Sequence, residues 1–191
     1  SVPICIASGY LITGGLHLDG LMDTFDGIFA GKKKRLKAMK DSKVGSFGVQ
    51  SIVFITLFQI ACLFKIQTQI FFTLPICLFW GRFSTLFFID QFKYISYKKK
   101  SINHKKSWNG LQKESLISIV FLFIYSVTLL ISSKSQEFII VNLFFLLISS
   151  FVSYLIPYIL GKKVGGFNGD TCGASVVIVE TSLLFIYAIL L

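Results

Sequence analysis

Long apolar runs separated by short charged stretches constrain this chain more than any other feature. Hydrophobic residues make up 54% of the 191 residues and charged residues only 15%, too few to coat a water-soluble globule. A membrane-spanning helix needs ~20 mostly apolar residues, and the windows that approach this length are 2–16, 47–64, 70–89, 116–132, 138–160 and 174–191. The sequence therefore predicts an all-α, polytopic transmembrane bundle of five to six spans.

The same windows predict a single integral-membrane domain over residues 1–191. The chain opens inside an apolar run and without Met, so we expect an N-terminal part of the protein to be missing. Contact with membrane lipid follows from the apolar surface, and the oligomeric state is left open.

Positive charge alternates between the connections. The first, third and fifth connections, around 32–43, 93–113 and 162–163, are rich in Lys, whereas the second and fourth hold only Lys65 and Lys134. By the positive-inside rule the odd connections face the cytoplasm, which predicts a multi-pass protein of the bacterial inner membrane. This pattern also explains the net charge of +10 without a nucleic-acid partner.

The segment that leads into the first connection carries three acids, Asp19, Asp23 and Asp26, at helical positions i, i+4 and i+7. Such positions share one helix face, where like charges repel unless a cation offsets them. Oxygen ligands on one face suit Mg²⁺ with a phosphate-bearing substrate. The alternative is a solvated helix face balanced by the downstream lysines. His17 is either a supporting catalytic group or a hydrogen-bonded structural one.

The next polar segment, 39–48, combines Lys40, Asp41, Lys43 and Gly45 at the entry to an apolar run. Backbone amides at a helix start, with lysines beside them, favour an anion. An ordinary connection capped by Ser42 or Ser46 would have a similar sequence.

A second motif opens the last apolar run, with Gly165, Gly166, Gly169 and Asp170, and Glu180 follows within the run. A glycine-rich helix start can bind phosphate, although Asp170 or Thr171 as a plain N-cap is the simpler alternative.

Glu180 needs a partner inside an apolar helix, and Arg82 is available. Their pair could be structural, or Arg82 could grip a phosphate.

Three strings in order, GGLHLDGLMDTFDG at 14–27, MKDSKVGSFGV at 39–49 and GGFNGDTCGA at 165–174, followed by Glu180, closely resemble the cobalamin synthase family, adenosylcobinamide-GDP ribazoletransferase. The resemblance implies transfer from adenosylcobinamide-GDP to α-ribazole or its 5′-phosphate, release of GMP, and a requirement for Mg²⁺. The site residues expected from it are Asp19, Asp23, Asp26 and Asp170 as metal ligands, Asp23, Asp26 and His17 as catalytic groups with Asp26 as proton acceptor, and Lys40, Asp41, Lys43, Gly45, Arg82, Gly165, Gly166, Gly169 and Glu180 around the phosphates.

Two other functions remain open from the sequence. A CDP-alcohol phosphotransferase-like enzyme also places Asp residues on membrane helices, but its Ala-Arg pair after Asp-Gly is missing at Asp19-Gly20 and Asp26-Gly27. A cation-coupled transporter would carry acids near the middle of several spans, whereas most acids here lie at one interface and Glu180 is the exception.

Overall fold

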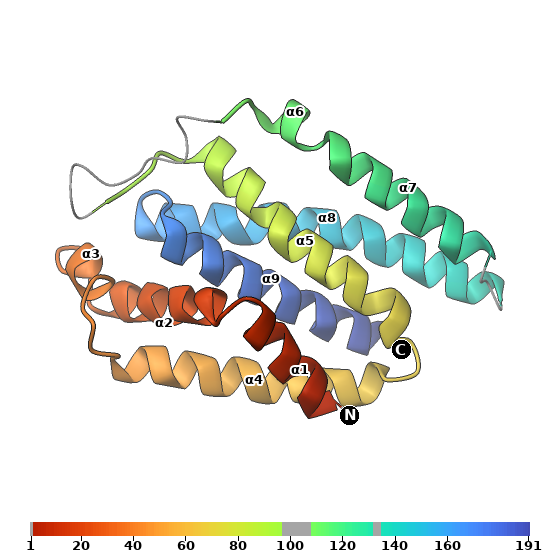
Figure 1. Cartoon of the computed structure of the whole chain (residues 1–191), viewed down its shortest axis with the longest axis horizontal. Coiled ribbons are helices and arrows are strands. Elements are labelled where there is room, and N and C mark those ends of the chain that lie inside the picture. Colours follow the sequence, from red (N-terminus) through yellow and green to blue (C-terminus); the bar gives the residue numbers. More distant parts are fainter. Residues whose placement is uncertain (1, 97–107, 132–134) are drawn as a thin grey trace.

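The computed structural model describes residues 2–96, 108–131 and 135–191, and the regular elements within these ranges are helices. They are α1 (Val2–Ile12), α2 (Leu16–Phe29), α3 (Arg35–Ala38), α4 (Ser46–Ile66), α5 (Ile70–Gln91), α6 (Leu111–Glu114), α7 (Leu116–Ile131), α8 (Gln136–Val164) and α9 (Gly169–Leu190). Among the described residues, α4, α5, α8 and α9 are long and apolar enough to cross a membrane. The prediction of an all-α polytopic bundle is confirmed (Figure 1).

Two of the predicted windows contain helices shorter than a span. α1 has 11 residues and α7 has 16, and at ~1.5 Å per residue neither covers ~30 Å of hydrocarbon. α1 ends early because Gly14 and Gly15 adopt left-handed conformations, with φ of 60° and 73°. The window 2–16 therefore contains a short helix, a tight turn and the first residue of α2.

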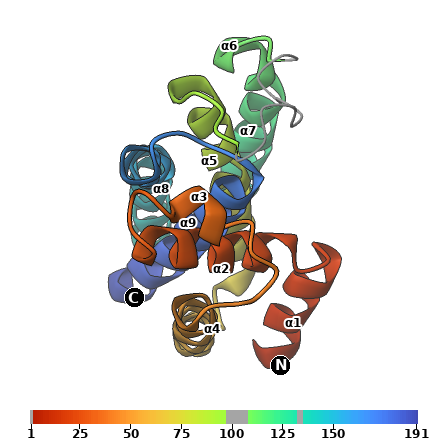
Figure 2. The ribbon, with the colours of Figure 1, turned by 90° about the vertical axis from the view of Figure 1, so that its left-hand side faces the viewer.

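Helix α9 forms the centre of the bundle, with α2, α4, α5 and α8 packed around it (Figure 2). In its most apolar segment 61% of the residues are buried, whereas in the matching segments of the other three candidate spans this share is between 22% and 33%. A helix that is apolar on all sides is covered either by protein or by lipid. Here α9 is covered by protein, and α4, α5 and α8 keep apolar outer faces for the bilayer.

The polar motifs share one end of the bundle. α3, the start of α4 and the connection from α8 to α9 all lie there, while the connection from α4 to α5 lies at the opposite end (Figure 1). The alternation of loop charge along the sequence thus corresponds to two physical ends. Part of the Lys-rich third connection, 97–107, lies outside the described residues.

Helices α2 and α9 approach closely where each has a glycine. A Cβ atom on Gly20 would lie 2.6 Å from the backbone oxygen of Asp170, and one on Gly173 would lie 3.2 Å from the Cα of His17. Since neither glycine has a side chain, the first turn of α9 rests directly against the backbone of α2. This contact fixes the separation of the two acidic motifs.

Helix α4 begins beneath the carboxylate of Asp26. The N–H groups of Gly45 and Gly48 donate to its two oxygens at 2.7 and 2.8 Å. These amides belong to the helix start, where donors lack intrahelical partners and the dipole favours a negative charge. A Cβ atom at Gly45 or Gly48 would collide with this carboxylate. The cap therefore comes from α2, and not from Ser42 or Ser46 as the alternative interpretation expected.

The α2–α9 contact predicts that a Gly→Ala substitution changes stability differently at two positions. Gly20→Ala should lower the free energy of unfolding by about 1–2 kcal/mol, because overpacking against backbone outweighs the gain in helix propensity. Gly9→Ala is the matched control, since a Cβ there has nothing within 4 Å, and it should leave stability equal or slightly higher. Thermal unfolding of the detergent-solubilised variants measures both, and equal shifts would contradict the close contact.

The Asp26 cap predicts a structural cost for removing one acceptor. In Asp26→Asn, an NH₂ group would face a backbone N–H, and the loss of a charged hydrogen bond costs about 2 kcal/mol. The melting temperature should fall by roughly 4–8 °C for a chain of this size. Glu137→Gln, at an exposed position in the first turn of α8, is the control. An unchanged melting temperature for Asp26→Asn would argue against the cap.

Candidate active site

Four acids from two distant motifs gather at the polar end of the bundle. Asp19, Asp23 and Asp26 lie along α2, and Asp170 lies in the first turn of α9. Burial raises the pKa of Asp23 to about 7, the negative charges of Asp170, Asp19 and Asp26 add to the increase, and Lys40 opposes it. A carboxylate that resists ionisation among like charges is one that a bound cation would stabilise.

Lys40 brings a positive charge from the second polar segment to this group. Its Nζ lies 3.7 Å from Oδ2 of Asp170. The lysine side chain is 55% exposed, so the pair adds little to stability and its effect is local. The preceding residue anchors it, because Met39 is 1% exposed and packs into the space that Gly27 leaves on α2. The buried Met39 side chain thus fixes the position of Lys40 beside Asp170.

Asp41 and Lys43 lie in the turn that leads into α4. The N–H of Lys43 donates to Oδ1 of Asp41 at 3.1 Å, and both residues are exposed. This contact shapes the turn. The role of the two side chains in phosphate binding stays a prediction.

The glycine-rich loop between α8 and α9 uses its amides within the protein. The N–H groups of Gly165 and Gly166 donate to the carbonyl of Gly161 at 2.8 and 3.1 Å, and that of Phe167 donates to the carbonyl of Lys93 at 3.0 Å. Gly165 serves as the left-handed end of α8, with φ of 95°. An anion bound beside these residues would therefore depend on side chains rather than on this set of amides.

The start of α9 is capped by Asn168, not by Asp170 or Thr171. Its side chain accepts the N–H of Thr171, and the Thr171 hydroxyl in turn accepts the N–H of Asn168. The Asn168 amide also donates to Oδ2 of Asp170 at 2.9 Å. Because Asn168 is the N-cap, the Asp170 carboxylate does not cap the helix, and it lies beside Lys40.

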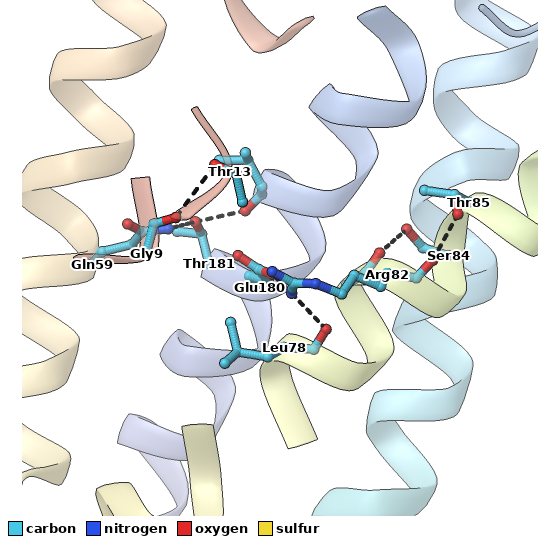
Figure 3. A network of polar contacts seen from close by, with 11 residues as sticks. Gly9, Thr13, Gln59, Leu78, Arg82, Ser84, Thr85, Glu180 and Thr181 are labelled. Carbon is cyan, nitrogen blue, oxygen red and sulfur yellow. Dashed lines mark hydrogen bonds and ion pairs between the residues drawn. The ribbon is translucent and has the colours of Figure 1, made fainter. Parts of the chain in front are cut away.

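Arg82 and Glu180 form a second polar group, deeper in the bundle. Nη1 of Arg82 lies 2.7 Å from Oε1 of Glu180 and also donates to the carbonyl of Leu78 at 2.9 Å (Figure 3). Glu180 follows Asp170 by ten residues in α9, about 15 Å along the helix. The predicted partnership of Arg82 and Glu180 is present, and the hydrogen bonds of the Arg82 side chain go to Glu180 and Leu78 rather than to the four acids.

His17 lies between the two groups. Burial lowers its pKa, and the positive charge of Arg82 lowers it further. It sits at the start of α2, two residues before Asp19. A neutral imidazole there can accept or donate a hydrogen bond to a ligand that bridges the two groups.

The donor set at the polar end fits Mg²⁺ in one specific way. Within the described ranges, no three His, Cys, Asp or Glu side chains are already gathered closely enough to enclose a metal ion. Mg²⁺ does not require such a cage, since it keeps several waters and takes one or two carboxylates together with substrate phosphate oxygens. Burial, and after it the neighbouring negative charges, raise the pKa of Asp23, and a divalent cation would offset the repulsion between these charges.

Sequence reasoning missed a polar chain that lines the space beside Arg82. The Tyr10 hydroxyl donates to Oε1 of Gln59 at 2.8 Å, and Nε2 of Gln59 donates to the Thr181 hydroxyl at 2.8 Å. Gln59 is 6% exposed. An amide in the middle of an apolar helix is costly unless it is paired, and that signal, present in the sequence, could have identified Gln59.

Comparison with known proteins connects this geometry to a family. The family model described as cobalamin-5-phosphate synthase matches residues 1–188. An adenosylcobinamide-GDP ribazoletransferase of Prochlorococcus marinus is 43% identical over 194 residues, covering 100% of this chain and 74% of that protein. Another from Caldanaerobacter subterraneus subsp. tengcongensis is 36% identical over 189 residues, covering 95% of this chain and 71% of that protein.

A search of solved structures found no match. The family model nevertheless spans both acidic motifs, the Lys40 segment and the Arg82–Glu180 pair. On this evidence the chain belongs to the cobalamin-5-phosphate synthase family.

Proposed function

We propose that this protein transfers the adenosylcobinamide phosphate group from adenosylcobinamide-GDP to α-ribazole or its 5′-phosphate and releases GMP. The observation that carries the proposal is the match to the family and to its ribazoletransferases along nearly the whole chain. The convergence of two acidic motifs at one end of the bundle supports the location of the reaction.

The reaction forms one bond and breaks one. A hydroxyl oxygen of α-ribazole bonds to the phosphorus next to the cobinamide, the bond from that phosphorus to the GMP oxygen breaks, and the hydroxyl proton passes to a base. Asp26 was the predicted base, but both of its oxygens accept backbone N–H groups, which makes a carboxylate a weaker proton acceptor. We therefore assign the proton to Asp23, one helical turn away on the same face.

The remaining charged groups serve the diphosphate. Asp19 and Asp170 would hold Mg²⁺. Asp23 and Asp26 were also predicted as ligands, but Asp23 is assigned here as the base and Asp26 is bound to the start of α4. Bound there, Mg²⁺ would neutralise the diphosphate and the departing GMP. Lys40, 3.7 Å from Asp170, places a further positive charge beside the leaving phosphate.

The site faces the cytoplasm of a bacterial inner membrane in this proposal. Support comes from the Lys-rich connections at 32–43 and 162–163, which share an end of the bundle with the acidic motifs, and from the positive-inside rule. A nucleotide-linked substrate such as adenosylcobinamide-GDP would reach the acids from that side.

The activity itself can be tested with the protein in detergent or liposomes. Incubation with adenosylcobinamide-GDP, α-ribazole and Mg²⁺ should give a cobalamin product and GMP in equal amounts, both measured by chromatography. Excess EDTA should abolish turnover, and added Mg²⁺ should restore it. Absence of both products with Mg²⁺ present would refute the function, whereas full turnover in EDTA would refute only the metal requirement.

Asp23→Asn should separate catalysis from folding. We expect kcat to fall by about 10²-fold or more, as when a group that stabilises the transition state is lost. The melting temperature in EDTA should not fall, because the substitution removes a carboxylate whose ionisation the site disfavours. Glu137→Gln is the control for activity. A normal rate for Asp23→Asn at saturating Mg²⁺ would contradict its role.

A further inference from the structure

A pocket lies beside the acids and deeper in the bundle, between α1, α4, α5 and α9. Its cavity volume is about 190 Å³, and its walls are mostly apolar, with Leu63, Cys77 and Val177 among them. Its lining also holds polar residues, which are Ser8, Tyr10, Thr13, His17, Gln59, Arg82 and Glu180. Of these, Tyr10, Thr13, Gln59 and Glu180 already hydrogen-bond within the protein, which leaves few free partners for a ligand. The proposed reaction at the acids does not use this pocket.

Two hydrogen-bonded groups contribute to the walls of the pocket. Gln59 connects Tyr10 to Thr181 through hydrogen bonds. Glu180 orients Arg82 through its ion pair (Figure 3). Both hydrogen bonds of the Arg82 side chain use Nη1, while a guanidinium carries five N–H donors in a fixed fork. The Arg82 side chain is 49% exposed, so it can donate to a ligand without losing Glu180.

The size and polarity of the pocket select one class of ligand. A dry cavity of ~150 Å³ accommodates a benzene-sized molecule, so the 190 Å³ here suits a small, mostly apolar aromatic base. Guanine presents several donors and acceptors, each of which would need a partner on burial, and the corrin ring is far larger. The benzimidazole of α-ribazole exposes a single ring-nitrogen acceptor, which one Arg donor satisfies.

The pocket is also in reach of the acids. His17 lines it, and Asp19 and Asp23 follow on α2 at about 3 and 9 Å along the helix axis. A nucleoside with its base in the pocket therefore extends its ribose along the first turns of α2. That places a ribose hydroxyl in the direction of the carboxylate assigned as base.

From these observations we propose that the pocket between α1, α4, α5 and α9 binds the benzimidazole base of the acceptor α-ribazole, with Arg82 donating to its free ring nitrogen. This inference rests on the proposed function and adds the acceptor subsite to it. The acids then handle the diphosphate, and the deeper pocket recognises the nucleoside.

Filling the pocket from α1 tests the proposal. Gly9 lines the pocket, and a Cβ there meets nothing within 4 Å, so Gly9→Trp can add bulk at this wall without a backbone clash. The KM for α-ribazole should rise about tenfold or more, while the KM for adenosylcobinamide-GDP and the Mg²⁺ requirement stay as in the wild type. Leu11→Trp is the matched control, because Leu11 is 80% exposed on the same helix and outside the pocket lining.

Each outcome has one meaning. An unchanged KM for α-ribazole, or a rise confined to adenosylcobinamide-GDP, would overturn the subsite. If Gly9→Trp does not fold, Ile12→Trp replaces it, since Ile12 lines the pocket and is 84% exposed, and the same two results decide. A wild-type protein that forms no product would instead show that the proposed function itself has failed.

Discussion

The direct contact of α2 with the first turn of α9 is the constraint on which the rest of the structure depends. Gly20 and Gly173 allow each backbone to touch the other helix, and this brings Asp170 to the acids of α2 although about 150 residues separate the motifs in sequence. The gathered negative charge is unfavourable by itself, because Asp170, Asp19 and Asp26 add to the increase that burial causes in the pKa of Asp23. Close glycine packing supplies the stability that lets the charges remain together, and a cation with a diphosphate substrate is what the arrangement is suited to receive.

The three acids of α2 look equivalent in sequence but occupy three environments. Asp19 is exposed, Asp23 is crowded by charge, and Asp26 is bound through both oxygens to the start of α4. The periodicity i, i+4, i+7 indicates only that they share a face. What distinguishes them is the part of the chain that packs over that face. Gly45 and Gly48 donate hydrogen bonds to Asp26, whereas the negative charge of Asp170 acts on Asp23. A motif with one spacing therefore combines a structural anchor with charged groups for chemistry.

The parts of this molecule that follow from local sequence were predictable, and the parts that depend on distant contacts were not. Apolar windows identified the four long helices, and the charged connections identified the end that carries the motifs. Gly14 and Gly15 shortened the first window through a local turn that the apolar average concealed. The cap on α4 and the use of the Gly165 and Gly166 amides depend on partners elsewhere in the fold. Spacing alone could not show that these groups were already satisfied.

The two polar groups of the bundle divide along the axis of α9. Asp170 at its start lies with the acids and Lys40, and Glu180 about 15 Å further along lies with Arg82 beside an apolar cavity. The Arg82 side chain is 49% exposed, and an exposed ion pair adds little to stability. The pair is therefore better explained by the N–H donors that it orients toward the cavity than by a gain in stability. Glu180 fixes the guanidinium in one orientation, and Tyr10, held by Gln59, faces the same cavity. The proposed function assigns the charged end to the phosphates, and the proposed acceptor subsite assigns the apolar cavity to a base; the first turns of α2 connect the two.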